Sequence, residues 1–168
     1  MTHDASSAEI GDLDGVRWHR PERALLRLRL AVASVAVGGP VLAGAGLVAV
    51  VVGVQQAVAT LLAGAAALGL MLVAVDRRWR AWGWFEREDD LLVRRGVLVR
   101  RVSVVPYGRM QFVDVVSGPL ERRFGLAKVT LHTAARATRA FVPGLSTGEA
   151  ARLRDHLAAL GEARQAGL

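Results

Sequence analysis

An uncharged stretch of 46 residues, from Leu30 to Val75, constrains this chain more than any other feature. Its only strongly polar side chains are those of two neighbours, Gln55 and Gln56. A helix of about 20 apolar residues crosses the hydrocarbon core of a bilayer, so the stretch is long enough for two crossings. It predicts a transmembrane helical hairpin with spans at about 30–54 and 57–75. Gly53, with its conformational freedom, and the two glutamines are expected to form the break between them.

The charges that flank this stretch predict its orientation. Five arginines precede the first span and three follow the second: Arg17, Arg20, Arg23, Arg27, Arg29, Arg77, Arg78 and Arg80. Because basic flanks stay in the cytoplasm, we expect a multi-pass protein of the cell membrane with both termini cytoplasmic. Residues 17–29 then form a basic juxtamembrane segment. A cleaved signal peptide is disfavoured, because residues 1–16 form an acidic tail, expected to be disordered, and the apolar run is too long.

Small residues recur at every fourth position within both spans. The two stripes are Ala45, Ala49 and Gly53, and Ala59, Ala63 and Ala67. Such stripes let helix backbones approach closely, which would suit a tight hairpin or a dimerisation face. The segment is so rich in Ala and Gly that the same spacing also arises by chance, and both interpretations stay open.

The segment from residue 76 to 168 carries the whole charge imbalance of the chain. It holds 17 basic and 10 acidic side chains, which equals the net charge of +7 of the complete sequence. The chain contains no cysteine. This excludes disulfides, thiolate zinc sites, iron–sulfur clusters and cysteine nucleophiles.

This basic segment has the periodicity of strands rather than helices. Short runs of β-branched and aromatic residues alternate with turn residues, which predicts antiparallel hairpins. The predicted strands lie near 82–84, 91–93, 100–105, 111–116, 127–133 and 139–142. Pro143 and Gly144 are expected to end the sheet.

Two helical segments complete the pattern. Pro119 begins a short helical turn that runs to Phe124. Ser146 and Glu149 have the spacing of a capping box, ahead of apolar residues at helical intervals. Those residues are Ala150, Leu153, Leu157 and Leu160. The fold expected for residues 76–168 is a bent antiparallel sheet of about six or seven strands with a C-terminal α-helix.

Three short segments, together with the hairpin of spans, resemble one known family. They are Trp18-His19-Arg20-Pro21, Val105-Pro106-Tyr107-Gly108-Arg109-Met110-Gln111 and Gly118-Pro119-Leu120-Glu121-Arg122-Arg123-Phe124-Gly125-Leu126-Ala127. Over about residues 18–160 the chain resembles the membrane-bound bacterial pleckstrin-homology-like (PH-like) proteins of the YdbS type. The resemblance implies a transmembrane hairpin followed by a mainly-β PH-like domain.

The same resemblance implies a partner. Such proteins are often found with a larger member of the family, so we expect another PH-like membrane protein as partner, or a second copy in a homo-oligomer. A headgroup-binding role by analogy with eukaryotic PH domains is also implied. The first hairpin lacks a Lys-x-x-x-Arg-x-Arg pocket, so specific phosphoinositide binding is not expected.

Catalysis is not expected from this sequence. The four histidines are scattered, and none has the spacing of a helical metal pair: His3, His19, His132 and His156. Ser103, His132 and Asp114 read better as ordinary strand side chains than as a triad, because no Gly-x-Ser-x-Gly elbow is present. We therefore expect no enzyme activity, no cofactor and no metal.

Clusters of arginine offer candidate binding sites. Four arginines flank one predicted hairpin tip and two lie in the short helical turn: Arg94, Arg95, Arg100, Arg101, Arg122 and Arg123. Each arginine near an anionic leaflet contributes about 1 kcal/mol, so these clusters are candidate lipid-binding residues. A solvated surface on an arginine-rich protein is the alternative. Nucleic-acid binding is not expected, since no recognition motif is visible and membrane proximity explains Trp82 and Trp84.

Two hypotheses of function remain. In the first, the domain is a membrane-anchored interaction module, a scaffold or regulatory subunit. It binds another membrane protein through the sheet edge near Arg109 and Gln111 or through the groove beside the terminal helix. In the second, the arginine clusters act as a sensor of anionic lipid headgroups. Salt separates the two, since it screens exposed charge over about 8–10 Å but leaves an apolar protein interface intact.

The charge pattern makes a prediction about topology. A reporter fused after Leu168 is expected to be active only in the cytoplasm, and a cysteine placed at Gln55 is expected to react with an impermeant thiol reagent from outside. Extracytoplasmic activity of the C-terminal fusion would contradict the predicted orientation.

Overall fold

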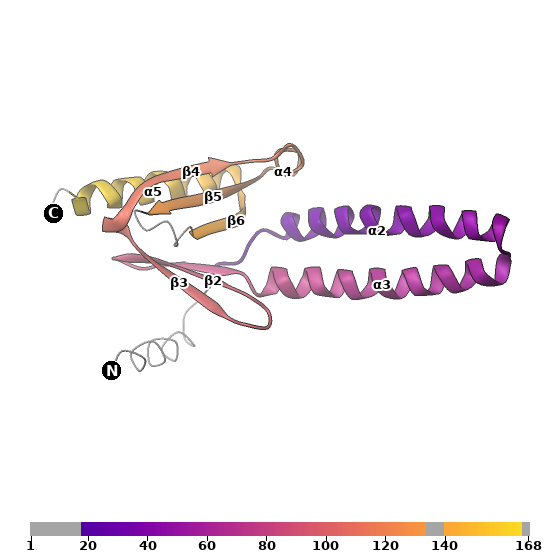
Figure 1. The fold of residues 1–168 in the computed structure, drawn as a ribbon. Coiled ribbons are helices and arrows are strands. Elements are labelled where there is room, and N and C mark those ends of the chain that lie inside the picture. The colour runs from indigo at the N-terminus through magenta and orange to yellow at the C-terminus, as the bar shows by residue number, and fades with distance from the viewer. Residues whose placement is uncertain (1–17, 134–139, 166–168) are drawn as a thin grey trace. The chain divides into compact units, whose positions relative to one another are not determined.

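The computed structural model describes residues 18–133 and 140–165. The chain divides into two compact units (Figure 1). One is a helical hairpin over Arg23–Trp79, and the other is a mainly-β domain that contains the described residues before and after the hairpin. The acidic tail expected over residues 1–16 lies outside the described residues, and so does Arg139 in the last expected strand.

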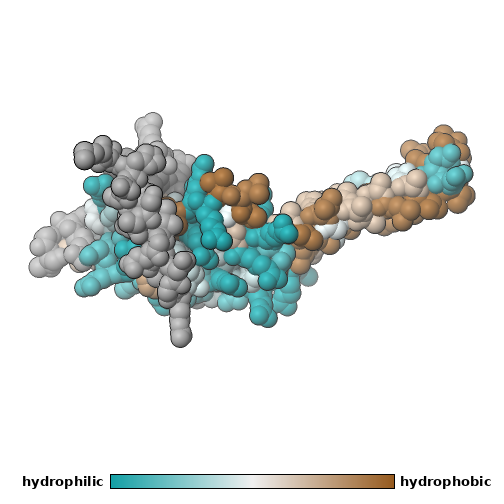
Figure 2. All heavy atoms as spheres, turned by 90° about the horizontal axis from the view of Figure 1, so that it is seen from below, coloured by the Kyte–Doolittle hydropathy of each residue, from teal (hydrophilic) through white to brown (hydrophobic). Residues whose placement is uncertain are grey.

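The hairpin consists of helices α2 (Arg23–Val51) and α3 (Val54–Arg80). Both are long and apolar enough to cross a membrane. Hydrophobic residues cover most of the hairpin surface, and hydrophilic residues gather at its tip (Figure 2). The helices run past the predicted spans into the charged flanks, because a helix satisfies its own backbone hydrogen bonds in lipid and in water alike.

The turn of the hairpin lies earlier in the chain than the two glutamines. Only Val52 and Gly53 lie between the helices, and their N–H groups both donate to the carbonyl oxygen of Val48, over 2.9 and 3.0 Å. Gly53 reverses the chain with a φ of 131°, which L side chains rarely adopt. The prediction that the two glutamines form the turn is wrong, since Gln55 and Gln56 lie in the first turn of α3.

Small side chains let the two helices approach each other. Ala45 is buried, and a Cβ atom on Gly64 of α3 would collide with the side chain of Val41 of α2. The stripe of Ala59, Ala63 and Ala67 is exposed instead. One of the two predicted stripes therefore contributes to the helix contact and the other does not.

In residues 18–133 and 140–165 the domain has six antiparallel strands and two α-helices, as the sequence predicts. The first sheet has the order β1-β2-β3 and the second the order β4-β5-β6. The strands are β1 (Gly83–Glu86), β2 (Asp90–Arg95), β3 (Arg101–Pro106), β4 (Met110–Val116), β5 (Leu126–Thr133) and β6 (Ala140–Ser146). The helical segments are the 3-10 turn η1 (Tyr107–Arg109), α4 (Pro119–Arg123) and α5 (Thr147–Gln165).

Helix α5 closes the core of the domain. Leu153 and Leu157 are fully buried in one cluster with apolar residues of both sheets. The predicted N-cap is confirmed, since the Ser146 hydroxyl accepts a hydrogen bond of 3.2 Å from the N–H of Glu149. The sequence therefore locates both the beginning and the buried face of this helix.

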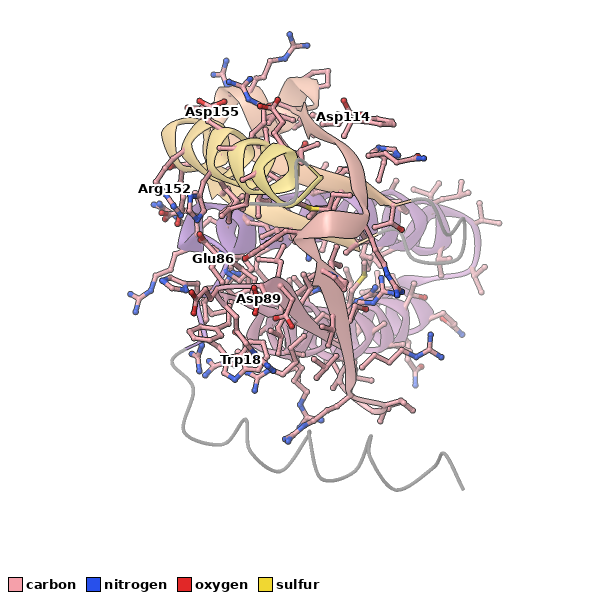
Figure 3. All side chains as sticks on the ribbon, turned by 90° about the vertical axis from the view of Figure 1, so that its left-hand side faces the viewer. Trp18, Glu86, Asp89, Asp114, Arg152 and Asp155 are labelled. Carbon is pink, nitrogen blue, oxygen red and sulfur yellow. The ribbon has the colours of Figure 1, made fainter. Side chains whose placement is uncertain are left out.

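An ion pair ties α5 to the first sheet from outside the core. Arg152 of α5 and Glu86 of β1 point toward each other (Figure 3), with 3.0 Å between Nη2 and Oε1. The hydrogen bond to Glu86 raises the pKa of Arg152 above its ordinary value. The guanidinium is exposed, so the pair adds little to stability but favours one placement of the helix.

The residues just before the hairpin are part of the domain. His19 and Trp84 of β1 exchange backbone hydrogen bonds of 2.9 and 3.0 Å, and their rings stack. Glu22 donates its N–H to the carbonyl oxygen of Gly144 over 2.8 Å. The sequence assigns this stretch to a juxtamembrane segment, since a single bridge between distant residues leaves no periodic signal.

The expectation that Pro143 and Gly144 end the sheet is wrong. Both lie inside β6, where the pairing shifts between Ala127 and Val129 of β5. Gly144 takes a φ of 69°, and the bulge accommodates a proline that has no N–H to donate. A turn signal in the sequence therefore marks a bulge rather than the end of a strand.

Tyr107, in η1, is the only tyrosine of the chain and is fully buried. Its hydroxyl donates a hydrogen bond of 2.9 Å to the carbonyl oxygen of Arg87. Burial, and to a smaller extent the nearby carboxylates of Glu86, Asp90 and Asp89, together raise the pKa of the Tyr107 phenol to about 12. The folded domain therefore favours the neutral phenol.

This shift predicts how stability depends on pH. The pKa is raised from 10 to about 12 on folding. The stability that Tyr107 contributes is therefore complete below pH 10 and decreases as the pH rises from 10 to about 12. An absorbance titration of tyrosinate in the full chain reports this residue alone. Tyr107→Phe, which costs about 1 kcal/mol for the lost hydrogen bond, should abolish this alkaline loss. Titration of the folded chain near the ordinary pKa would contradict the prediction.

Candidate functional site

A groove lies between strand β4 and helix α5. It encloses about 300 Å³ and is lined by residues 110–113 of β4 and by α5 residues that include Ala158 and Glu162. Among the described strands β4 pairs with β5 alone, so β4 is an edge strand of the second sheet. A free strand edge offers unpaired N–H and C=O groups to another chain.

Small residues of α5 keep this groove open. Ala158 is exposed and lines the groove. A Cβ atom on Gly161 would lie 3.7 Å from the carbonyl oxygen of Tyr107 and 3.9 Å from Cε of Met110, which is ordinary contact. At Gly161 the helix therefore passes close to η1 and to the first residue of β4.

A bulge in β4 directs side chains toward the groove. Met110 pairs with Thr133 and Phe112 pairs with His132, so Gln111 is an extra residue on the β4 side. Such a bulge changes the face to which neighbouring side chains point. It brings Met110 and Val113 toward the core and leaves Gln111 exposed at the groove.

The outer face of β4 carries a second group of contacts. Phe112 stacks on His132 with 4.1 Å between ring centroids, although 52% of Phe112 is exposed. Oδ2 of Asp114 lies 3.2 Å from Nε2 of His132. Further exposed apolar residues follow along the chain: Val115, Val116, Leu120 and Phe124. Exposed apolar side chains therefore occur along β4 and in the segment that follows it.

The two predicted partner-binding residues have different positions. Gln111 lines the groove, as the sequence hypothesis requires. Arg109 is exposed at the end of η1 and is not among the lining residues. Phe112 also lines the groove but is not among the predicted partner-binding residues. Its position two residues before Asp114, on the same face of a predicted strand, could have indicated it as a candidate.

The six predicted lipid-binding arginines fall into two classes. The guanidinium of Arg94 lies 4.7 Å from the ring centroid of Trp18, and that of Arg95 lies 5.9 Å from the ring of Phe141. Both are half-buried. Lys128, which the sequence hypothesis did not include, also lies 5.9 Å from Phe141. These contacts are cation–π interactions, so the first two arginines have a role within the domain.

The other four arginines are exposed: Arg100, Arg101, Arg122 and Arg123. Arg100 ends the β2–β3 loop, Arg101 begins β3, and Arg122 and Arg123 lie in α4. None of the four forms an ion pair with an acidic residue in the described part of the chain. Their charge is therefore available to an anionic surface.

The residues considered for a triad belong to different sheets. Ser103 is in β3 of the first sheet, whereas Asp114 and His132 are in β4 and β5 of the second. Within residues 18–133 and 140–165, no three His, Asp or Glu side chains are grouped so that they could hold a metal ion.

Comparisons with known proteins agree with this architecture. The family model described as Bacterial PH domain matches residues 25–161. The chain is 36% identical over 83 residues to UPF0699 transmembrane protein YdbS of Bacillus subtilis, a match that covers 49% of this chain and 51% of that protein. The chain thus spans about half the length of this curated relative, and no solved structure matches. Because the family model matches most of the chain and two of its helices are apolar enough to span a membrane, the chain belongs to the bacterial PH domain family and is a membrane protein.

Proposed function

We propose that this protein is a membrane-anchored PH-like interaction module, a scaffold or regulatory subunit that binds another membrane protein at the inner membrane surface. The observation that carries the proposal is the groove between the edge strand β4 and helix α5. An extended segment of the partner adds a strand to β4, and its side chains enter the groove. Backbone hydrogen bonds supply affinity in this mode, and the pocket for side chains supplies specificity.

The partner is another PH-like membrane protein or a second copy of this chain. Membership of the bacterial PH domain family and the two apolar helices support a partner in the same membrane. Tethering in one bilayer raises the effective concentration of both proteins, so a groove of about 300 Å³ is sufficient for a useful contact. In this proposal the protein is not an enzyme, and both termini lie in the cytoplasm.

A second candidate function is sensing of anionic lipid headgroups. It is favoured by the four exposed arginines of the β2–β3 loop and α4, which have no acidic partner among the described residues. The contacts of Arg94 and Arg95 with aromatic rings reduce the part that these two can take.

Two neighbouring alanines of α5 provide a matched test of partner binding. Ala158 lines the groove and Ala159 does not, and both are exposed. Ala158→Arg should block the groove and lower capture of the partner at least tenfold, whereas Ala159→Arg adds the same charge outside the groove. Arginine is a good helix former, so neither change should unfold the helix.

Capture is measured with a photo-crosslinking residue at Gln111 in the full chain in native membranes. Mass spectrometry of the crosslinked peptides identifies a second membrane protein or, with isotope-labelled copies, this chain itself. We expect the crosslink to be lost in Ala158→Arg and kept in Ala159→Arg. Equal crosslinking in both variants, or crosslinking to lipid alone, would refute binding in the groove.

A further inference from the structure

The loop that joins β2 to β3 presents an exposed apolar tip. Its three central residues are Val97, Leu98 and Val99, of which 42%, 98% and 67% is exposed. In the view of Figure 2 the loop forms a small hydrophobic patch bordered by hydrophilic residues. A leucine that is almost completely exposed has no function in the packing of the domain, so the tip is available to an apolar environment outside it.

The backbone of the loop is tightly constrained. Gly96 has a φ of 104°, and a Cβ atom there would collide with the carbonyl oxygen of Val99. Strands β2 and β3 stay paired up to Arg95 and Arg101. The loop is therefore a short, closed turn that projects its three apolar side chains from the end of a ladder.

Positive charge surrounds the base of this tip. Arg95 and Arg101 are direct partners across the ladder, and Arg100 lies next to them in the loop. Like charges that face each other across two strands disfavour the pairing unless an anion lies between them. In the described part of the chain no acidic side chain forms an ion pair with any of these three arginines.

Strand pairing places the loop at the membrane-connected end of the first sheet. Arg94, at the base of the loop, is the pairing partner of Gly83, the first residue of β1. Gly83 follows Arg80, the last residue of α3, by three positions. The β1–β2 turn around Glu88 lies at the opposite end of the same sheet, because the strands are antiparallel.

We infer that the β2–β3 loop is a membrane-inserting element. The side chains of Val97, Leu98 and Val99 enter the interfacial region of the anionic bilayer that the chain spans, while Arg100 and Arg101 bind lipid phosphates at its surface. An apolar tip with long basic side chains behind it matches the layered polarity of a lipid leaflet. The inference rests on and deepens the second candidate function, and it is independent of the β4 groove and of any protein partner.

Because the chain has no cysteine, one introduced cysteine can report the position of the loop. Leu98→Cys carries an environment-sensitive nitrobenzoxadiazole fluorophore, and the full chain is placed in nanodiscs of phosphatidylcholine and phosphatidylglycerol. Glu88→Cys, in the exposed turn at the other end of the sheet, is the matched control. We expect a blue-shifted emission and quenching by spin-labelled lipids for the probe at Leu98, and neither for the probe at Glu88.

Charge variants test the role of the arginines. Changing Arg100 and Arg101 to Gln should lower the ratio of inserted to free loop by roughly tenfold or more. Raised salt should also lower this ratio, because it screens the attraction to anionic lipid. Changing Arg122 and Arg123 to Gln removes the same charge from α4 and should leave the Leu98 probe unchanged.

Two outcomes would overturn the inference. One is an emission of the Leu98 probe that matches the Glu88 probe in anionic nanodiscs. The other is a blue shift that disappears when each nanodisc holds a single copy, because a second protein chain and not lipid would then cover the loop.

A label-free measurement guards against effects of the dye. In anionic nanodiscs trypsin should cleave after Arg100 and Arg101 more slowly than in detergent, and Leu98→Asp should remove this protection.

Discussion

The burial of one stripe of helix α5 holds the PH-like domain together. Among the described strands the two three-stranded sheets share no ladder with each other. Leu153 and Leu157 of α5 pack in the cluster that contains residues of both sheets. Deletion of a buried leucine side chain costs about 2–5 kcal/mol, a large fraction of the stability of a small domain. The groove depends on the same packing, because the distance between α5 and β4 is set by the residues beneath them.

The hairpin imposes a second constraint, which concerns where the domain can act. Its apolar side chains are exposed along most of α2 and α3, and only lipid can cover so much apolar surface at low cost. The domain therefore works next to a bilayer, where even weak contacts gain from a high effective concentration. The groove and the β2–β3 loop are two separate surfaces, one suited to a strand and the other to lipid.

Most of the fold could be predicted from local pattern, and the errors share one cause. The strands, the short helix at Pro119 and the cap at Ser146 follow from alternation, proline placement and side-chain hydrogen bonding within a few residues. The bulge at Gly144 and the bridge from His19 to Trp84 depend on register between distant segments. Register leaves no local signature in the sequence. Pro143 and Gly144 therefore predict the end of a strand, although they lie within one. Gln111 was expected at the candidate site, whereas Ala158 was not, because only packing brings α5 beside β4.

The sequence by itself determined that this chain has two apolar helices, a basic mainly-β domain and a capped terminal helix, since hydropathy, charge and capping are properties of neighbouring residues. It also determined which arginines are clustered along the chain. Only the tertiary structure decided that Arg94 and Arg95 lie over aromatic rings, that Arg101 faces Arg95, and that the apolar tip between them is exposed. The physical reason is that exposure and pairing are set by what packs against a residue, and packing joins segments that are far apart in the chain.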